Sequence, residues 1–175
     1  KQAHGAGLTR DTKLVFPAAG WQHTLMKKDF TPEGMLFGHN TLYFANPNAT
    51  PLQKEFVAWY EAKHKDYPNW EADRAYFAIA SYKAAVEKAA AAKGGNWPSQ
   101  DDVIGALESG LSVESLGGKG SWRKDHIADQ TFIQGFTTHT NKYDFVTLDR
   151  FDTMFSPDLQ KPTGAPRFRG CAPPC

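Results

Sequence analysis

Apolar residues at the start of the chain form two short runs separated by small and polar residues. The run at 12–16 ends at Pro17 and predicts a short buried strand. Residues 35–37 follow a Pro-Glu-Gly turn and predict a second strand, with a helical turn expected at 22–28. A loop of small residues at 18–20 links the first strand to this turn.

The middle of the chain has helical spacing. Thr50 followed by proline resembles an N-terminal cap, and apolar side chains recur behind it at helical intervals (Leu52, Phe56 and Tyr60). A second helix is predicted over 72–92, where alanine is abundant, and a glycine pair ends it. Ser99 and two aspartates predict a third helix that ends near Gly110.

The last third of the chain returns to strand patterns. Residues 112–116 and 121–122 flank a glycine-rich turn, and β-rich runs follow at 130–138 and 144–155. From residue 156 the sequence is rich in proline and glycine, as in a surface tail. Strands on both sides of a helical region predict an α/β fold.

Composition and charge exclude several classes of partner. The 175 residues are 41% hydrophobic and 22% charged, with a formal charge of +1, which is typical of a soluble globular protein. Basic residues are scattered, so no nucleic-acid partner is expected. The apolar runs are far too short to span a membrane.

Motifs for catalysis or cofactor binding are weak. The Gly-Gly-Lys-Gly run at 117–120 lacks the lysine-serine/threonine pair that opens a helix after a phosphate loop, so it is interpreted as a hairpin turn. Asp125, His126 and Asp129 suggest acid–base or metal chemistry, but there is no G-x-S-x-G elbow and no second histidine at helical spacing. We therefore interpret His126 as structural, and we expect no enzyme activity, no cofactor and no metal.

The two ends of the chain lead to separate expectations. Residues 1–8 read as the last turns of a helix without an initiator methionine, which suggests a product that has lost its N-terminal part. Cys171 and Cys175 are separated by Ala-Pro-Pro. They form a local disulfide, remain free thiols, or bridge to another part of the protein.

Aromatic residues are abundant, at 13% of the chain. Most occur at helical spacing and are expected in the core. Tyr76 and Phe77 differ because they lie in the first third of the predicted helix 72–92, and the N-termini of helices commonly face ligands.

The order of these segments resembles the C-terminal part of a type I periplasmic solute-binding protein of the branched-chain amino-acid or amide type. The resemblance covers residues 1 to about 155. It rests on Pro32-Glu33-Gly34-Met35 between two strands, on a helix with Ala75-Tyr76 and Tyr82-Lys83-Ala84, and on the strand that leads into Asp125-His126.

The resemblance implies a two-lobed fold with doubly wound α/β lobes and three crossing segments. Residues 1–37 would then belong to the second lobe and 42–137 to the first. Residues 38–41 and 138–141 would be hinge crossings, and 142–175 would return to the second lobe and form the tail.

The resemblance also implies a ligand site between the lobes. Members that bind amino acids carry a Pro-Glu-Gly loop after the first of these strands, and its carboxylate holds the ligand ammonium. This chain has Pro17-Ala18-Ala19-Gly20 at that position. We predict that the ligand-binding residues include the small-residue loop, the tryptophan after it and two aromatic side chains of the helix (Ala18, Ala19, Gly20, Trp21, Tyr76 and Phe77). An aromatic or other carboxylate, or an amide, is as compatible with this site as an amino acid.

The function implied is capture of a small solute outside the cytoplasm, in the periplasm, for an ABC importer. The partners would be the ligand, the permease and the missing N-terminal part of the same protein. The alternative is a ligand-sensing module of a receptor or regulator with the same fold.

Overall fold

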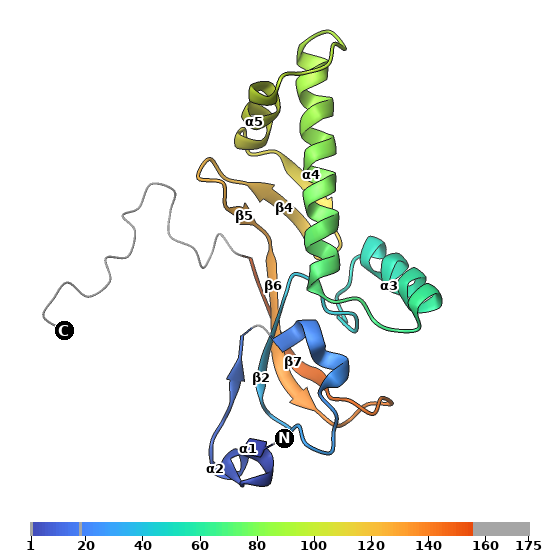
Figure 1. Ribbon diagram of the computed structural model, residues 1–175, viewed down its shortest axis with the longest axis vertical. Helices are drawn as coiled ribbons and strands as arrows, with labels where there is room; N and C mark the ends of the chain where they lie inside the picture. The colour runs from blue at the N-terminus through green and yellow to red at the C-terminus, as the bar shows by residue number, and fades with distance from the viewer. Residues whose placement is uncertain (1, 18, 156–175) are drawn as a thin grey trace, which may run out of the picture.

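The computed structural model describes residues 2–17 and 19–155 and contains two β-sheets with helices packed beside them (Figure 1). The larger sheet has the order β1-β2-β6-β7, and only β1 and β2 are parallel. The smaller sheet is antiparallel, with the order β3-β4-β5. The strands are β1 Val15–Phe16, β2 Leu36–Asn40, β3 Ser112–Ser115, β4 Gly118–Trp122, β5 Ala128–Asp129, β6 Thr131–Thr138 and β7 Thr147–Phe155.

The helices lie mainly between the second and third strands of the chain. They are α1 Gln2–Gly5, α2 Leu8–Asp11, the 3₁₀ helix η1 Ala19–Leu25, α3 Pro51–His64, α4 Trp70–Ala92 and α5 Gln100–Glu108. The helical turn predicted at 22–28 therefore starts earlier in the chain. Cys171 and Cys175 lie outside the described residues.

The larger sheet has an aromatic core. Seven buried residues form it, from β2 and β7 with the residues just before each, from the loop after β2, and from β6 (Met35, Phe37, Tyr43, Phe44, Ile133, Phe145 and Leu148). Tyr43 ties these parts together, because its hydroxyl accepts a hydrogen bond from the backbone N–H of Leu148 at 3.0 Å. Burial raises the pKa of Tyr43 well above its ordinary value, so the hydroxyl stays protonated.

The helix starts follow local capping chemistry. Thr50 accepts a hydrogen bond from the N–H of Gln53 at 3.1 Å, with proline in the first turn of α3. Ser99 and Asp102 form a capping box at the start of α5. Hydrogen bonds from Lys93 and Ser99 lower the pKa of the Asp102 carboxyl to about 2, so this cap is ionised at neutral pH.

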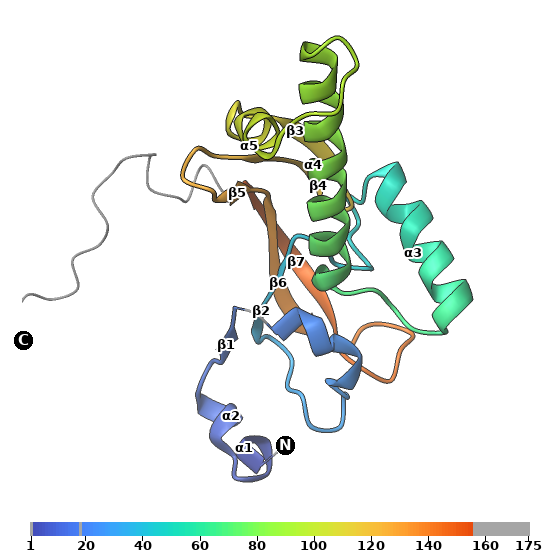
Figure 2. The ribbon, with the colours of Figure 1, turned by 45° about the horizontal axis from the view of Figure 1, so that its top comes forward.

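Helix α4 runs from the neighbourhood of η1 past the smaller sheet (Figure 2). Its buried face is a row at four-residue spacing (Asp73, Phe77, Ser81, Ala85 and Ala89). The two alanines pack against Ala106 of α5 in a second small core. Small side chains on both helices allow the two backbones to approach closely.

Strands β2 and β6 lie side by side in the larger sheet and run in opposite directions, and β6 begins directly after β5 of the smaller sheet. Gly38 pairs with Gln134, and Asn40 pairs with Ile133, with an irregularity in between. A second irregularity, between Gln134 and Phe136, occurs in the pairing of β6 with β7. The pairing is therefore irregular on both sides of β6, close to Gln134.

Candidate functional site

The carboxyl ends of the parallel strands β1 and β2 meet at the loop that leads into η1. In open α/β sheets, ligands bind outside such strand ends. The backbone of the loop and the backbone of β2 lie so close together here that only glycine fits at two positions. A Cβ atom at Gly38 would overlap the carbonyl oxygen of Pro17, and one at Gly20 would overlap the ring of His39. The loop after β1 is therefore held directly against β2.

Two buried histidines lie beneath this loop. His23 of η1 and His39 of β2 are 4% and 1% exposed, and their ring centroids lie 5.4 Å apart. His23 Nδ1 lies 2.9 Å from the carbonyl oxygen of Gly20 and therefore donates to it. The ring of His23 stacks on Phe44 at 4.8 Å, and the ring of His39 lies 4.5 Å from Tyr43.

Burial controls the charge of this pair. Desolvation lowers the pKa of His23, against weaker opposite effects from the Gly20 hydrogen bond and Asp66. Desolvation lowers the pKa of His39 further, with a contribution from the neighbouring His23. Both imidazoles are therefore neutral at pH 7.

The predicted site residues fall into two groups. Ala18 lies outside the described residues, and Ala19, Gly20 and Trp21 form the start of η1, where Gly20 is buried. The other group, Tyr76 and Phe77, lies on α4. Helix α4 and η1 are in contact, while Phe77 itself packs on Trp122 of β4, so a shared ligand site for the two groups stays a prediction.

Phe77 and Tyr76 have different surroundings. Phe77 is 3% exposed, and its ring stacks on Trp122 of β4 at 5.5 Å, over Gly120. Tyr76 is 37% exposed and so reaches the surface. A role for Phe77 as a ligand wall stays a prediction, because in this structure its ring fills the space between α4 and the smaller sheet.

Sequence reasoning did not single out His23 or His39 as functional residues. It also missed Asp73, which is fully buried in the first turn of α4 and accepts a hydrogen bond from the N–H of Gly117 at 3.0 Å. Gly117 in turn packs on the carbonyl of Thr41, just after β2. A buried carboxylate thus joins the helix, the glycine-rich turn and the end of β2. The only signals in the sequence were polar residues inside apolar segments.

The predicted hairpin and the predicted structural histidine are found on the smaller sheet. The chain does turn between β3 and β4, but at 116–117 and not over the predicted 117–120, because residues 118–120 already pair with β3 as part of β4. His126 is exposed, and its Nε2 atom lies 2.8 Å from a carboxylate oxygen of Glu108, which ties the β4–β5 turn to α5. In the described part of the chain, no group of three histidine, cysteine or acidic side chains is placed to hold a metal ion.

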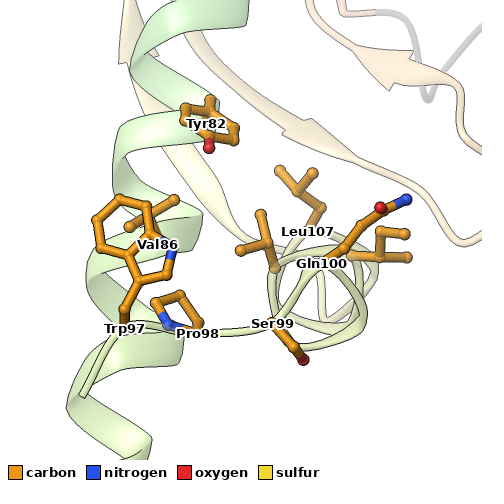
Figure 3. Close-up of a pocket in the computed structure, with 9 residues that line it drawn as sticks. Tyr82, Val86, Trp97, Pro98, Ser99, Gln100 and Leu107 are labelled. Atoms are coloured by element: carbon orange, nitrogen blue, oxygen red, sulfur yellow. The ribbon is translucent and has the colours of Figure 1, made fainter. Parts of the chain in front are cut away.

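A second concave surface lies between α4 and α5 (Figure 3). It has a volume of about 470 Å³. Its walls are mostly apolar, and Figure 3 shows Tyr82 and Val86 on α4 facing Leu107 on α5, with Trp97 at the mouth. The groove is lined by residues of these helices and of the loop between them, so it is separate from the strand ends of the larger sheet.

Comparison with known proteins identifies the family. The model of the periplasmic binding protein family matches residues 1–135, which is more than three quarters of the chain. The chain belongs to the periplasmic binding protein family. The predicted α/β fold of this family is confirmed. Among curated proteins, none matches this sequence.

Solved structures share the fold of this periplasmic binding protein. One is a solute-binding protein of an ABC transporter from Rhodopseudomonas palustris in complex with 3,4-dihydroxybenzoic acid, with a TM-score of 0.64 and 21% identity over 88% of this chain. A branched-chain amino-acid transporter protein from the same species has a TM-score of 0.55 and 22% identity over 66%. The leucine-binding protein LivK from Thermotoga maritima has a TM-score of 0.54 and 18% identity over 73% of this chain.

The chain spans 40%, 29% and 32% of the lengths of these three solved chains. The similarity therefore shows the fold of the matched part. Among residues 2–17 and 19–155, none of the helices is long and apolar enough to cross a membrane.

Proposed function

We propose that this chain is part of an extracytoplasmic solute-binding protein that captures a small ligand and delivers it to an ABC importer. Membership of the periplasmic binding protein family supports solute capture. Delivery to a permease and location in the periplasm are the further parts of the proposal, and they follow from the usual role of this family.

The observation that carries the proposal is the irregular pairing of the adjacent strands β2 and β6, the second of which leads on from the smaller sheet. Residues 38–40 lie beside 133–134, and both neighbouring ladders are irregular there. Asn40 has a φ of 48°, which breaks the extended conformation of β2. Such interruptions absorb dihedral changes when domains close over a ligand. We propose this level as the hinge.

This geometry changes one part of the proposed domain division. The predicted crossing at 138–141 lies at the other end of β6, where His139 contacts Glu33 and Thr31. The His139 N–H donates to the Glu33 carboxylate at 2.6 Å, which lowers the pKa of Glu33. We therefore propose that 131–134, and not 138–141, forms the crossing beside 38–41.

The ligand class that we propose is an aromatic or other carboxylate, or an amide. The loop after β1 has no acidic side chain between Pro17 and Trp21, so this loop supplies no anion for an ammonium group. The similar solved protein in complex with 3,4-dihydroxybenzoic acid gives a concrete first candidate.

The facing side of the cleft requires a further polypeptide. The chain covers 40% of the similar 3,4-dihydroxybenzoic acid complex, and we propose that an N-terminal segment of the complete protein supplies the rest. The 175-residue chain alone is then expected to bind ligand weakly at best.

A thermal-shift screen of the complete protein tests the proposal. The ligands are 3,4-dihydroxybenzoate, benzoate, leucine and an aliphatic amide. Ligand at 100 times its Kd stabilises the native state by about 2.7 kcal/mol, which gives a shift of several degrees. A shift with a carboxylate or amide supports the proposal. A shift with leucine alone would contradict the ligand class, and turnover of any of these compounds would contradict the binding role.

A further inference from the structure

The start of η1, just after β1, is held by a hydrogen bond within that helix, between the backbone of Gly20 and the side chain of the buried His23. A carbonyl oxygen accepts only, so the contact between Gly20 O and His23 Nδ1 places the proton of the neutral ring on Nδ1. His23 Nε2 then carries no proton, and it is buried without a hydrogen-bond partner among the described residues. The ring is locked in place by the parallel face of Phe44, at an interplanar angle of 10°.

His39 supports the same loop from the strand side. Its Nδ1 atom is buried without a hydrogen-bond partner and faces the Cα of Gly20 so closely that a Cβ there would overlap it. The pocket therefore has no space for a water molecule between this nitrogen and the loop. A proton added at His39 Nδ1 requires Gly20 to move away.

The surroundings offer little compensation for a positive charge. From the loop after β2 and from the segments near 67 and 143, the titratable neighbours are tyrosines (Tyr43, Tyr67 and Tyr143). Asp66 attracts a charge on His23 but makes no hydrogen bond with it. Near Phe145, Lys27 is already paired with Asp144 at 2.7 Å, and Lys27 lies 5.6 Å from the Phe145 ring.

We propose that His23 is a positioning residue for the ligand-binding loop, and that protonation of the His23–His39 pair in mild acid releases the loop and weakens ligand binding. The second part rests on the proposed solute-binding function. The first part concerns the chain by itself.

Proton linkage determines how pH shifts the equilibrium between the closed and the opened state. In the closed state both rings are neutral, whereas in an opened state the hydrated rings have ordinary pKa values near 6.5. Protons therefore favour the opened state only below about pH 6.5. Between pH 7.5 and 5.5, each histidine that stays neutral in the closed state increases the population of the opened state by up to about tenfold, since the proton-binding factor of a group with a pKa of 6.5 rises from about 1.1 to about 11.

Hydrogen exchange of the wild-type chain at pH 7.5 and 5.5 tests the first part, after correction for intrinsic exchange rates. Opening of segments 17–23 and 36–40 is expected to increase at least tenfold in acid. In the double variant His23→Asn, His39→Gln the increase should fall below twofold, because asparagine still donates to Gly20 O but does not titrate. His4→Gln is the matched control, since His4 is exposed and should leave the wild-type response unchanged.

If the double variant does not fold, NMR of the wild-type imidazoles decides the question. The proposal requires His23 to be in the Nδ1–H form and both rings to stay neutral in the closed state at pH 5.5. Ordinary titration of either ring near 6.5, with unchanged exchange of the loop, would overturn it.

Titration of the complete protein with 3,4-dihydroxybenzoate tests the second part. Affinity should decrease about tenfold or more between pH 7.5 and 5.5 in the wild type, and less than twofold in the double variant. Equal pH dependence in both proteins would refute the acid release. Absence of binding at pH 7.5 would count against the proposed function and the ligand half of this inference, whereas the exchange result still decides the role of His23.

Discussion

Replacement of Phe77 by alanine separates a core role from a ligand-wall role. The ring is 3% exposed and stacks on Trp122 at an interplanar angle of 21°. Removal of a buried phenylalanine costs about 3–5 kcal/mol, and loss of a stacked aromatic pair accounts for about 0.5–1.5 kcal/mol of such a cost. Small domains have a total stability of about 5–15 kcal/mol, so the variant should be much less stable.

Urea denaturation of the chain measures this effect. We expect the midpoint for Phe77→Ala to fall with an unchanged slope, and Phe77→Leu to recover more than half of the loss. Ile79→Ala is the matched control on the same helix, because Ile79 is 72% exposed and its removal should change stability by less than about 0.5 kcal/mol. In the complete protein, Phe77→Ala should then reduce binding only through the folded fraction. Stability within 1 kcal/mol of wild type, together with at least tenfold weaker ligand binding of the folded protein, would refute the core assignment.

Three further predictions concern the larger sheet. Gly38→Ala should destabilise the chain by about 1–3 kcal/mol in urea denaturation, because its Cβ would overlap the carbonyl of Pro17; an unchanged midpoint would contradict that close approach. Tyr43→Phe should cost about 1–3 kcal/mol by leaving the N–H of Leu148 buried without its acceptor, and rapid amide exchange at Leu148 should accompany the loss. The free energy of unfolding should be constant above about pH 7 and decrease below pH 6.5, by at most about 1.4 kcal/mol per pH unit for each of the two buried histidines, because their folded-state pKa values are lowered. Stability that is flat from pH 7.5 to 5.5 would contradict the burial of neutral rings.

Features that depend on local chemistry were predictable from the sequence. Thr50 and Ser99 cap helices because a side-chain oxygen can satisfy a free N–H two or three residues ahead, whatever the rest of the fold does. The glycine-rich turn between β3 and β4 is local in the same sense.

The sequence did not predict which face of α4 is buried. The helix was expected over 72–92 and is found over Trp70–Ala92. Hydrophobicity would turn Ile79 and Tyr82 inward, yet both are exposed, and the buried row contains Asp73 and Ser81. Close packing of α5 and the smaller sheet favours small side chains over large apolar ones, and this choice depends on partners that are distant in the sequence.

The candidate site was only partly predictable. A loop of small residues was visible after the apolar run that ends at Pro17, and its role in a ligand site, which the family resemblance implies, stays a prediction. His23 and His39 were not recognised as a pair, because their contact exists only after β1 and β2 align in parallel and bring η1 against β2. A long-range strand pairing of this kind has no signature in residue spacing.

The position of β1 at the edge of the larger sheet favours self-association of the chain in solution. The strand pairs with β2 on one side and is an end strand of the sheet, and Val15 and Phe16 are 60% and 43% exposed. An apolar end strand is a template for the addition of another strand. At high concentration, copies of this chain should therefore self-associate through β1, with a sedimentation coefficient that rises with concentration. The substitution Val15→Lys, which places a charge on that edge, should prevent this self-association.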